Sequence, residues 1–165
     1  MICNLTGPYA YDQNVVVLWS NSIADAQAPT DAEMNLATDL MTPYTLTDII
    51  GWEITTDILG DGIWLPQEEE RMGEQKLSDC RLGFAAKRTP TGDIRSFWNR
   101  GDEGFILILP SGPYDDVPTA YLNVYPVRVA QLSQQQLLRT GGGSTVIVTF
   151  AVRARCGENV TVVGT

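Results

Sequence analysis

The apolar positions in the middle of the chain alternate with polar ones and predict a strand. One face of this segment carries Cys80, Leu82, Phe84 and Ala86. Successive side chains of a strand point to opposite faces, so the segment is predicted to be half-buried. Residues 105–109 form an unbroken apolar run, which is short enough for a strand that is buried on both faces.

A short helix is predicted between these two strands, over about residues 91–100. Ile94, Phe97 and Trp98 have the i, i+3, i+4 spacing that gives a helix one apolar stripe. Gly101 stands where a residue in the left-handed conformation would end the helix. We therefore expect a core unit of strand, helix and buried strand, in which Ile94, Phe97 and Trp98 hold the helix against one side of a sheet.

Alternating or β-branched segments predict further strands at residues 14–19, 46–58, 121–132, 144–155 and 160–163. Pro126 interrupts one of them, which predicts an edge strand or a bulge because proline cannot donate to a ladder. The linker 133–143 ends in three glycines and is expected to join its two flanking strands as an extended hairpin.

The strand predicted at residues 46–58 has a core face and a wet, acidic face. Its core face carries Leu46, Ile50, Trp52, Ile54 and Ile58. Its wet face carries Thr47, Glu53, Thr55 and Asp57. Asp48 and Ile49 break the alternation, which indicates a bulge.

Residues 59–78 have no periodicity and predict a long acidic loop. Loops of this length in a compact domain are usually functional or disordered. The acidic run consists of Glu68, Glu69 and Glu70. Trp64 lies within the loop and favours docking of the loop against another surface. Earlier in the chain, Thr30 and Glu33 have the spacing of a capping box, which predicts a helical turn.

These elements give about six or seven strands and one clear helix in a chain of 165 residues. The count predicts a mainly β fold, a β-sandwich or a partly closed barrel, flanked by the one short helix. A chain of this length is expected to form a single domain, here residues 1–165. Within it, residues 1–28 are expected to supply a strand and an extended N-terminal segment.

The charge is acidic and unevenly distributed. The net charge is −9, and residues 1–75 hold 13 acidic residues but one basic residue, Arg71. Residues 76–165 hold 7 acidic and 10 basic residues, so the two halves of neighbouring copies could attract each other. A chain with this balance is expected to be repelled by nucleic acid rather than to bind it. An acidic surface that serves solubility alone is the simpler interpretation of the charge.

The residue types exclude the commoner kinds of catalytic site. The sequence lacks histidine, which removes Ser-His-Asp and Cys-His nucleophiles and the usual zinc sites. Cys3, Cys80 and Cys156 are far apart, and such a sparse, odd set suggests reduced thiols in a cytoplasmic setting. Glu53 and Asp57 would lie about 13 Å apart along a strand, too far for an acid–base pair. We expect no enzymatic activity, cofactor or metal.

No apolar run approaches the roughly 18 residues that could span a bilayer. The short apolar run near the N-terminus has no basic residues before it, so we expect no signal peptide. Binding to membranes is not predicted.

An ordered series of segments resembles the tail tube, or major tail, proteins of bacteriophages with long non-contractile tails, especially phages of actinobacteria. The segments are residues 29–33, 38–40, 82–84, 93–98, 100–107, 124–127 and 148–152. The resemblance covers roughly residues 29–155. It departs at the N-terminus, which is longer here, and in the loop 59–78.

The resemblance implies a structural virion protein with a β-sandwich and a flanking helix. Family members form rings, usually hexameric, which stack into the tube that conducts the DNA genome during ejection. The inner sheets join into one barrel that lines the bore. The resemblance also implies a tape measure protein, a tail terminator and distal tail proteins as partners. Assembly is expected in the host cytoplasm, and the finished protein belongs to the tail of the virion.

On this interpretation, the acidic wet face of residues 46–58 suits a bore along which DNA must slide. The lumen-lining candidates are Glu53, Thr55 and Asp57. Weakly periodic segments suit contacts between rings, where the acidic run could meet a basic patch on the next ring. The inter-ring candidates are Trp64, Glu68, Glu69, Glu70, Arg153 and Arg155.

Two other functions are compatible with the sequence. A tail completion or connector protein would share the fold and form a single ring. A monomeric β-sandwich binding module would instead expose a cluster of aromatic side chains and would not polymerise.

Overall fold

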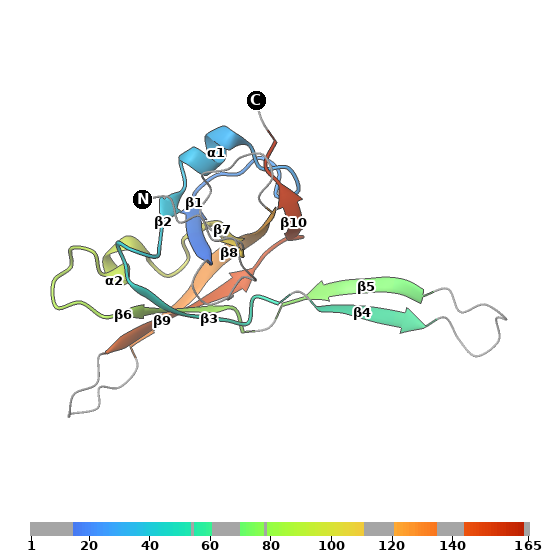
Figure 1. The fold of residues 1–165 in the computed structure, drawn as a ribbon. Coiled ribbons are helices and arrows are strands. Elements are labelled where there is room, and N and C mark those ends of the chain that lie inside the picture. The colour runs from blue at the N-terminus through green and yellow to red at the C-terminus, as the bar shows by residue number, and fades with distance from the viewer. Residues whose placement is uncertain are drawn as a thin grey trace, which may run out of the picture.

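A computed structural model describes residues 15–53, 55–60, 70–77, 79–110, 121–134 and 144–163, with the side chains of residues 55–60 and 70–76 left out of the description. Most described residues belong to one antiparallel sheet (Figure 1). Its strands are β1 (Val16–Ser20), β2 (Thr38–Asp39), β3 (Leu46–Ile50), β6 (Arg81–Ala85), β7 (Glu103–Leu109), β8 (Tyr121–Gln134), β9 (Thr145–Val152) and β10 (Gly157–Thr161). The order across the sheet is β2-β1-β7-β8-β9-β6-β3, with β10 paired to β8.

The mainly β prediction with a short flanking helix is confirmed. The described residues also contain α1 (Asp31–Asn35), α2 (Ile94–Phe97) and a two-stranded hairpin of β4 (Thr55–Gly60) and β5 (Glu70–Lys76). The large sheet does not close into a barrel, because β2 and β3 at its two ends do not pair with each other. The structure thus has two short helices where the apolar pattern predicted one.

The sheet curls around its main hydrophobic cluster. Val17 and Ile106 from β1 and β7 share this cluster with Phe84 and Val148 from β6 and β9. Strands β1 and β6 are not neighbours in the sheet, so the two halves of the sheet must face each other across the cluster. This curvature gives the partly closed form that the alternating strands predicted.

Strand β7 is buried on both faces, as its unbroken apolar run predicted. Ile106 and Ile108 face the main cluster, whereas Leu107 and Leu109 face a second one. The second cluster lies under α1 and the C-terminal strand, with Met34 from α1 as a buried member.

The capping box predicted before α1 is present. Thr30 Oγ1 accepts a hydrogen bond from the Glu33 amide at 3.4 Å, and the Glu33 carboxylate accepts one from the Thr30 amide at 2.9 Å. The same carboxylate accepts a hydrogen bond from Ala24 N at 2.7 Å. Glu33 therefore satisfies amides on two segments, and these hydrogen bonds lower its pKa.

Strand β8 is longer and more central than the sequence predicted. It runs through Pro126, which pairs in register with Phe105 of β7. On its side opposite β7, β8 pairs with β10 before Pro126 and with β9 after it. The missing N–H of Pro126 therefore falls between these two strand pairings. A bulge does occur, but between Val129 and Gln131 rather than at the proline. The prediction of an edge strand was wrong, and the predicted bulge is present but begins three residues after Pro126.

The single long strand predicted at residues 46–58 was also wrong. The chain forms β3, breaks at Gly51 with φ at 78°, and resumes as β4 in a separate hairpin. The predicted bulge is confirmed, because the register of β3 against β6 shifts between Leu46 and Asp48. Ile50, which the alternation placed on the core face, is exposed, whereas Trp52 is buried.

Residues 59–78 are not one long loop. Residues 55–60 pair with residues 70–76, so both ends of the predicted loop belong to an antiparallel hairpin, and its tip lies outside the described residues. We call β4 and β5 together the arm. Figure 1 shows the arm leading away from the rest of the sheet. The hairpin joins strands that are 10 or more residues apart in the sequence, so its pairing had no local signal.

Helix α2 is organised by a buried carboxylate at its N-terminus. Asp93 is 2% exposed and accepts hydrogen bonds from the amides of Lys87 at 2.8 Å and Arg95 at 2.9 Å. The Arg95 guanidinium also donates to both of its oxygens at 2.8 Å. The helix ends at Phe97, so Gly101, although its φ is +97°, lies beyond the cap that the sequence assigned to it.

Replacing Asp93 by alanine is expected to destabilise the protein by about 2–3 kcal/mol, because two backbone amides and the Arg95 guanidinium lose their acceptor. The hydrogen bond from Arg95 is the main cause that holds the pKa of Asp93 well below its ordinary value. A lowered folded pKa adds stability above the unfolded value of about 3.9, and this stability disappears as the pH falls further. Denaturant unfolding between pH 3 and 7 measures both effects. Asp93→Asn keeps one acceptor oxygen but cannot ionise, so the free energy of unfolding should depend less on pH at the acidic end of this range. An unchanged pH dependence would contradict the role given to Asp93.

Candidate functional site

Strand β3 offers an open sheet edge. One side of β3 pairs with β6, and none of the described strands pairs with its other side. Ile49 and Ile50 are 38% and 47% exposed on this strand. An exposed edge with apolar side chains is a template for pairing with another chain.

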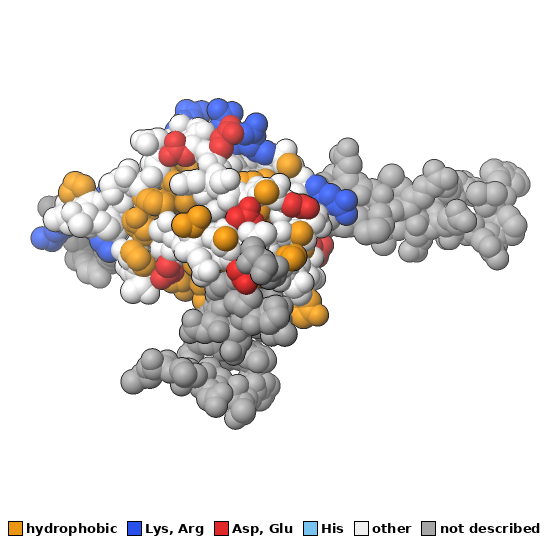
Figure 2. All heavy atoms as spheres, turned by 90° about the horizontal axis from the view of Figure 1, so that it is seen from above, with side chains coloured by type: hydrophobic (Ala, Val, Ile, Leu, Met, Phe, Trp, Pro, Cys, Tyr) orange, Lys and Arg blue, Asp and Glu red, His pale blue; other side chains and the backbone are white. Residues whose placement is uncertain are grey.

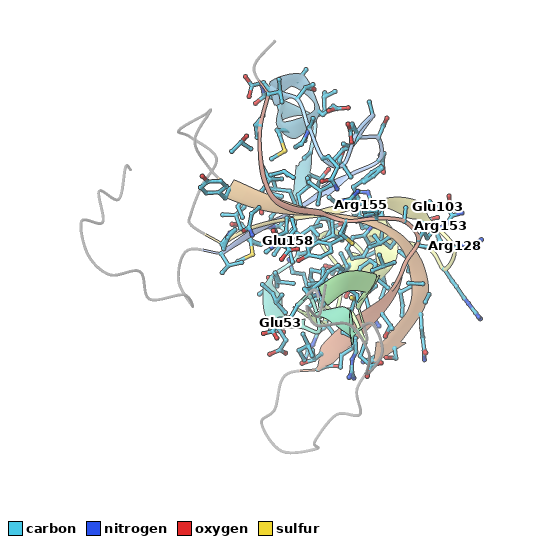
Figure 3. All side chains as sticks on the ribbon, turned by 90° about the vertical axis from the view of Figure 1, so that its right-hand side faces the viewer. Glu53, Glu103, Arg128, Arg153, Arg155 and Glu158 are labelled. Atoms are coloured by element: carbon cyan, nitrogen blue, oxygen red, sulfur yellow. The ribbon has the colours of Figure 1, made fainter. Side chains whose placement is uncertain are left out.

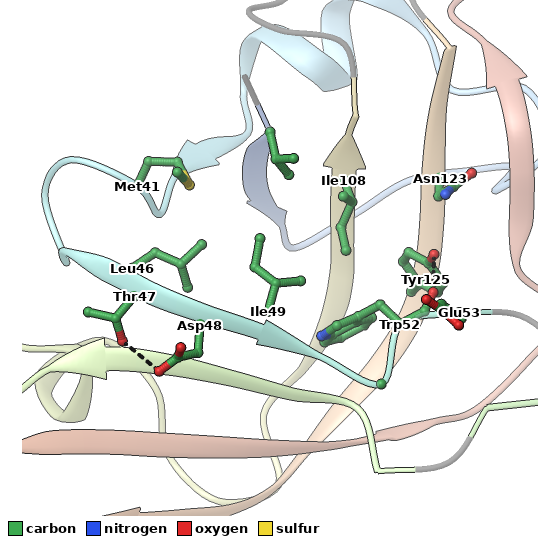
Figure 4. A pocket seen from close by; sticks show the side chains of 12 residues that line it. Met41, Leu46, Thr47, Asp48, Ile49, Trp52, Glu53, Ile108, Asn123 and Tyr125 are labelled. Atoms are coloured by element: carbon green, nitrogen blue, oxygen red, sulfur yellow. Dashed lines mark hydrogen bonds between the residues drawn. The ribbon is translucent and has the colours of Figure 1, made fainter. Parts of the chain in front are cut away.

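A groove of about 700 Å³ lies beside this edge (Figure 4). It occupies the space between β3 and the facing half of the sheet, so segments distant in sequence line it. Its apolar lining comes from Val15, Met41, Leu46, Ile49, Trp52, Ile108 and Tyr125. Figure 4 shows Ile49 of β3 and Ile108 of β7 on opposite sides of this space. Glu53 is at its rim and is exposed. The groove and the edge together form a surface that a β-rich partner could cover.

A cluster of charged side chains lies at the start of β7 and the end of β9. Glu103 forms ion pairs with Arg153 and, at 3.7 Å, with Arg128. Figure 3 shows Glu103, Arg153 and Arg128 grouped together, with Arg155 nearby along the C-terminal segment. All four side chains are exposed, and two arginines, Arg128 and Arg153, share the one carboxylate of Glu103, so the cluster keeps a positive charge. Figure 2 shows Lys and Arg side chains at several places around the rim of the face seen there, with the largest group at the top beside acidic side chains.

The structure locates only part of the residues that the sequence proposed as sites. Glu53 is exposed, and the backbones of Thr55 and Asp57 lie in β4 of the arm. Glu70 is the first residue of β5, while Trp64, Glu68 and Glu69 lie outside the described residues. The lumen and inter-ring roles of these residues stay predictions.

The three residues predicted to hold the helix are in the core. Ile94 and Trp98 are buried, and Phe97 is half-buried against the same cluster. Trp98 makes edge-on contacts with Trp19, Phe84 and Phe150 at centroid distances of 5.1, 5.9 and 5.2 Å. It is a packing residue rather than an exposed aromatic platform.

Sequence reasoning missed the β3 edge and the groove. The available signal was the pair Ile49-Ile50, two consecutive apolar residues in an alternating segment, but Ile49 was assigned to a bulge with Asp48 and Ile50 to the core face. The groove had no local signal, because Val15, Ile108 and Tyr125 come from three separate strands or their flanks.

The described residues offer little for metal or membrane chemistry. Within the ranges that the structure covers, no group of three acidic, cysteine or histidine side chains could hold a metal ion. Cys80 and Cys156 are buried free thiols, and burial raises the pKa of each to about 11. A search of the described helices for one that is both long and apolar enough to cross a bilayer finds none.

Comparison with known proteins identifies the family of the chain. A family model for the phage tail tube protein matches residues 6–165. No curated protein matches the sequence. The matched span includes every described strand, both helices and the arm. The chain therefore belongs to the phage tail tube protein family.

Proposed function

We propose that copies of this chain assemble into rings, six to a ring, and that the rings stack into the tail tube that conducts the DNA genome during ejection. Membership of the tail tube family makes the protein a structural component of the phage tail. The observation that carries the finer proposal is the open edge of β3 beside a groove with a mixed apolar and polar lining. Both features require a cover, and in a self-assembling protein the cover is a second copy.

Within a ring, the β3 edge of one copy receives a strand of its neighbour. The exposed isoleucines and the groove then become buried, which removes apolar surface from water at about 25 cal/mol per Å². A contact that joins two different surfaces repeats around the ring and closes it. The sheet edges are thereby paired, as in other closed β assemblies.

Between rings, the arm is the element with the reach to contact a second layer. Each copy carries one arm, so the contact between layers pairs two different surfaces and can propagate into a tube. The acidic run, which ends in sequence at Glu70, the first residue of β5, and the arginine cluster around Glu103 have opposite charges, which suits such a contact.

The bore is proposed to be lined by acidic and polar residues, with Glu53, Thr55 and Asp57 as candidates. Double-stranded DNA carries one negative charge per roughly 1.7 Å, so a bore rich in lysine would hold it. A net charge of −9 per copy favours passage without binding. The tape measure, tail terminator and distal tail proteins are the proposed partners at the tube's interior and ends, and host cytoplasm is the proposed place of assembly.

Negative-stain electron microscopy of the purified protein tests this function. Long hollow tubes are the expected result. Single rings that do not stack would favour a tail completion or connector protein. Monomers at all concentrations would contradict the proposal and favour a monomeric binding module.

Reversing the charge of the acidic run, by Glu68→Lys, Glu69→Lys and Glu70→Lys together, is expected to shorten or abolish the tubes. The reason is that the run would then repel the arginine cluster of the next ring. Tube lengths measured on micrographs provide the readout, and the matched control is Glu68→Gln, Glu69→Gln and Glu70→Gln, which removes charge without reversing it. Tubes of unchanged length in the lysine variant would rule out this contact.

A further inference from the structure

The arm joins the body through two connections that contact each other. The chain leaves β3 through Gly51 and Trp52 and returns from β5 to β6 through Asp79 and Cys80. We call these four residues the arm joint. Gly51 and Asp79 both have positive φ, at 78° and 58°. Aspartate is one of the few residues besides glycine that adopt this conformation, so the sequence suits a turn on each connection.

Three hydrogen bonds from buried side chains tie the joint together. The Cys80 thiol donates to the Gly51 carbonyl at 3.1 Å, which links the outgoing and returning connections. Trp52 Nε1 donates to the Arg81 carbonyl at 2.9 Å, again across the two connections. The Tyr125 hydroxyl donates to the Trp52 carbonyl at 2.7 Å and fixes the joint to the central strand β8.

Tyr125 makes two separate contacts with the joint, one through its ring and one through its hydroxyl. Its ring meets that of Trp52 edge-on at 5.0 Å, and Figure 4 shows the two side chains next to each other. Phenylalanine could make the same ring contact. Only the hydroxyl, which is buried with the rest of the side chain, reaches the backbone of the joint. Burial raises the pKa of Tyr125 above its ordinary value.

We propose that Tyr125 and Trp52 are positioning residues of the arm, which set the direction in which β4 and β5 leave the body before copies assemble. The use of the arm between rings rests on the proposed function, but its direction is a property of the single chain. A six-residue strand is about 20 Å long, so a change of about 10° at the joint moves its far end by roughly 3.5 Å. Packed interfaces do not tolerate such a shift. The joint therefore determines whether arms of neighbouring copies meet their targets.

The distance between the arm and the body in unassembled protein tests this inference. Spin labels are attached to cysteines introduced by Gln75→Cys in β5 and Gln131→Cys in β8, in a Cys3→Ser background. Cys80 and Cys156 are buried, and their high thiol pKa keeps them from labelling. Pulsed electron spin resonance then gives the distribution of distances. Tyr125→Phe removes only the hydroxyl, and Tyr121→Phe, at an exposed position of the same strand, is the matched control.

The parent and Tyr121→Phe should each give one narrow distribution. Tyr125→Phe should broaden it about twofold while near-ultraviolet circular dichroism shows a folded body. Trp52→Phe, which loses the bond to Arg81, should broaden it in the same way. Unchanged distance distributions in both Tyr125→Phe and Trp52→Phe would overturn the inference. Unfolding of both variants would also overturn it, because the two residues would then serve only the stability of the core. Because the protein is unassembled, failure to form tubes would refute the proposed function without affecting this result.

Discussion

Trp98→Ala is expected to destabilise the unassembled protein by about 3–5 kcal/mol, the range for truncating a large aromatic side chain in a packed core. Trp98 is 2% exposed and contacts four other aromatic rings. These rings belong to β1, β6, β9 and α2, so the cavity would separate the helix from both halves of the curled sheet. Denaturant unfolding followed by circular dichroism measures the loss.

Trp98→Phe provides the control for this prediction. Phenylalanine keeps an aromatic ring in the cluster, and the indole Nε1 of Trp98 is buried without a hydrogen-bond partner among the described residues. The phenylalanine variant should therefore lose about 1–2 kcal/mol, clearly less than the alanine variant. A loss below about 1 kcal/mol for Trp98→Ala would contradict the central place given to this residue.

Ile50→Lys is expected to abolish tube formation while leaving the single chain folded. Ile50 is 47% exposed on β3, so the unfolding free energy should change by no more than about 0.5 kcal/mol. In an assembled ring the new ammonium group would be buried without a partner, at a cost of several kcal/mol. Each 1.4 kcal/mol weakens association about tenfold, so the sedimentable fraction should fall by at least about 100-fold.

Leu36→Lys separates this effect from a general effect of charge. Leu36 is 83% exposed at the end of α1, away from the β3 edge, and the two substitutions change the net charge equally. Added positive charge reduces the repulsion between acidic copies, so charge alone would favour assembly in both variants. Leu36→Lys should therefore form tubes like the parent. Normal tubes from Ile50→Lys would show that the β3 edge is not a contact.

The sequence predicted those strands in which buried and exposed residues alternate, or in which the apolar residues form an unbroken run. Leu82 and Phe84 in β6, and Val146, Val148 and Phe150 in β9, are buried as their alternation required. The capping box of Thr30 and Glu33 was also predictable, because its geometry depends on residues three apart. Local rules succeeded wherever local spacing alone decides which side chains meet.

The break after β3 and the arm could not be predicted in this way. Gly51 turns the chain with a positive φ, and the buried hydrogen bonds of Trp52 reach residues about 30 and 70 positions later. The alternating pattern of residues 46–58 continues across this break, so it predicted one strand through a point where the chain changes sheet. Contacts distant in sequence outweighed the local pattern.

The candidate site was predictable only in outline. Family resemblance led to self-assembly, and the charge distribution led to acidic and basic contact regions. The groove is formed by segments that are brought together when the sheet curls, so no local motif marks it. Arg153, proposed as a contact for the next ring, already pairs with Glu103 in its own chain, a pairing between β7 and the end of β9 that spacing does not reveal.

A cryo-electron microscopy reconstruction of the assembled protein is the decisive measurement for assembly through the β3 edge. We expect stacked rings around a hollow bore, with a strand of one neighbour hydrogen-bonded to the outer edge of β3 and the groove beside Ile49 filled by that neighbour. A reconstruction in which the β3 edge faces solvent in every copy, or in which copies meet only through other surfaces, would contradict it.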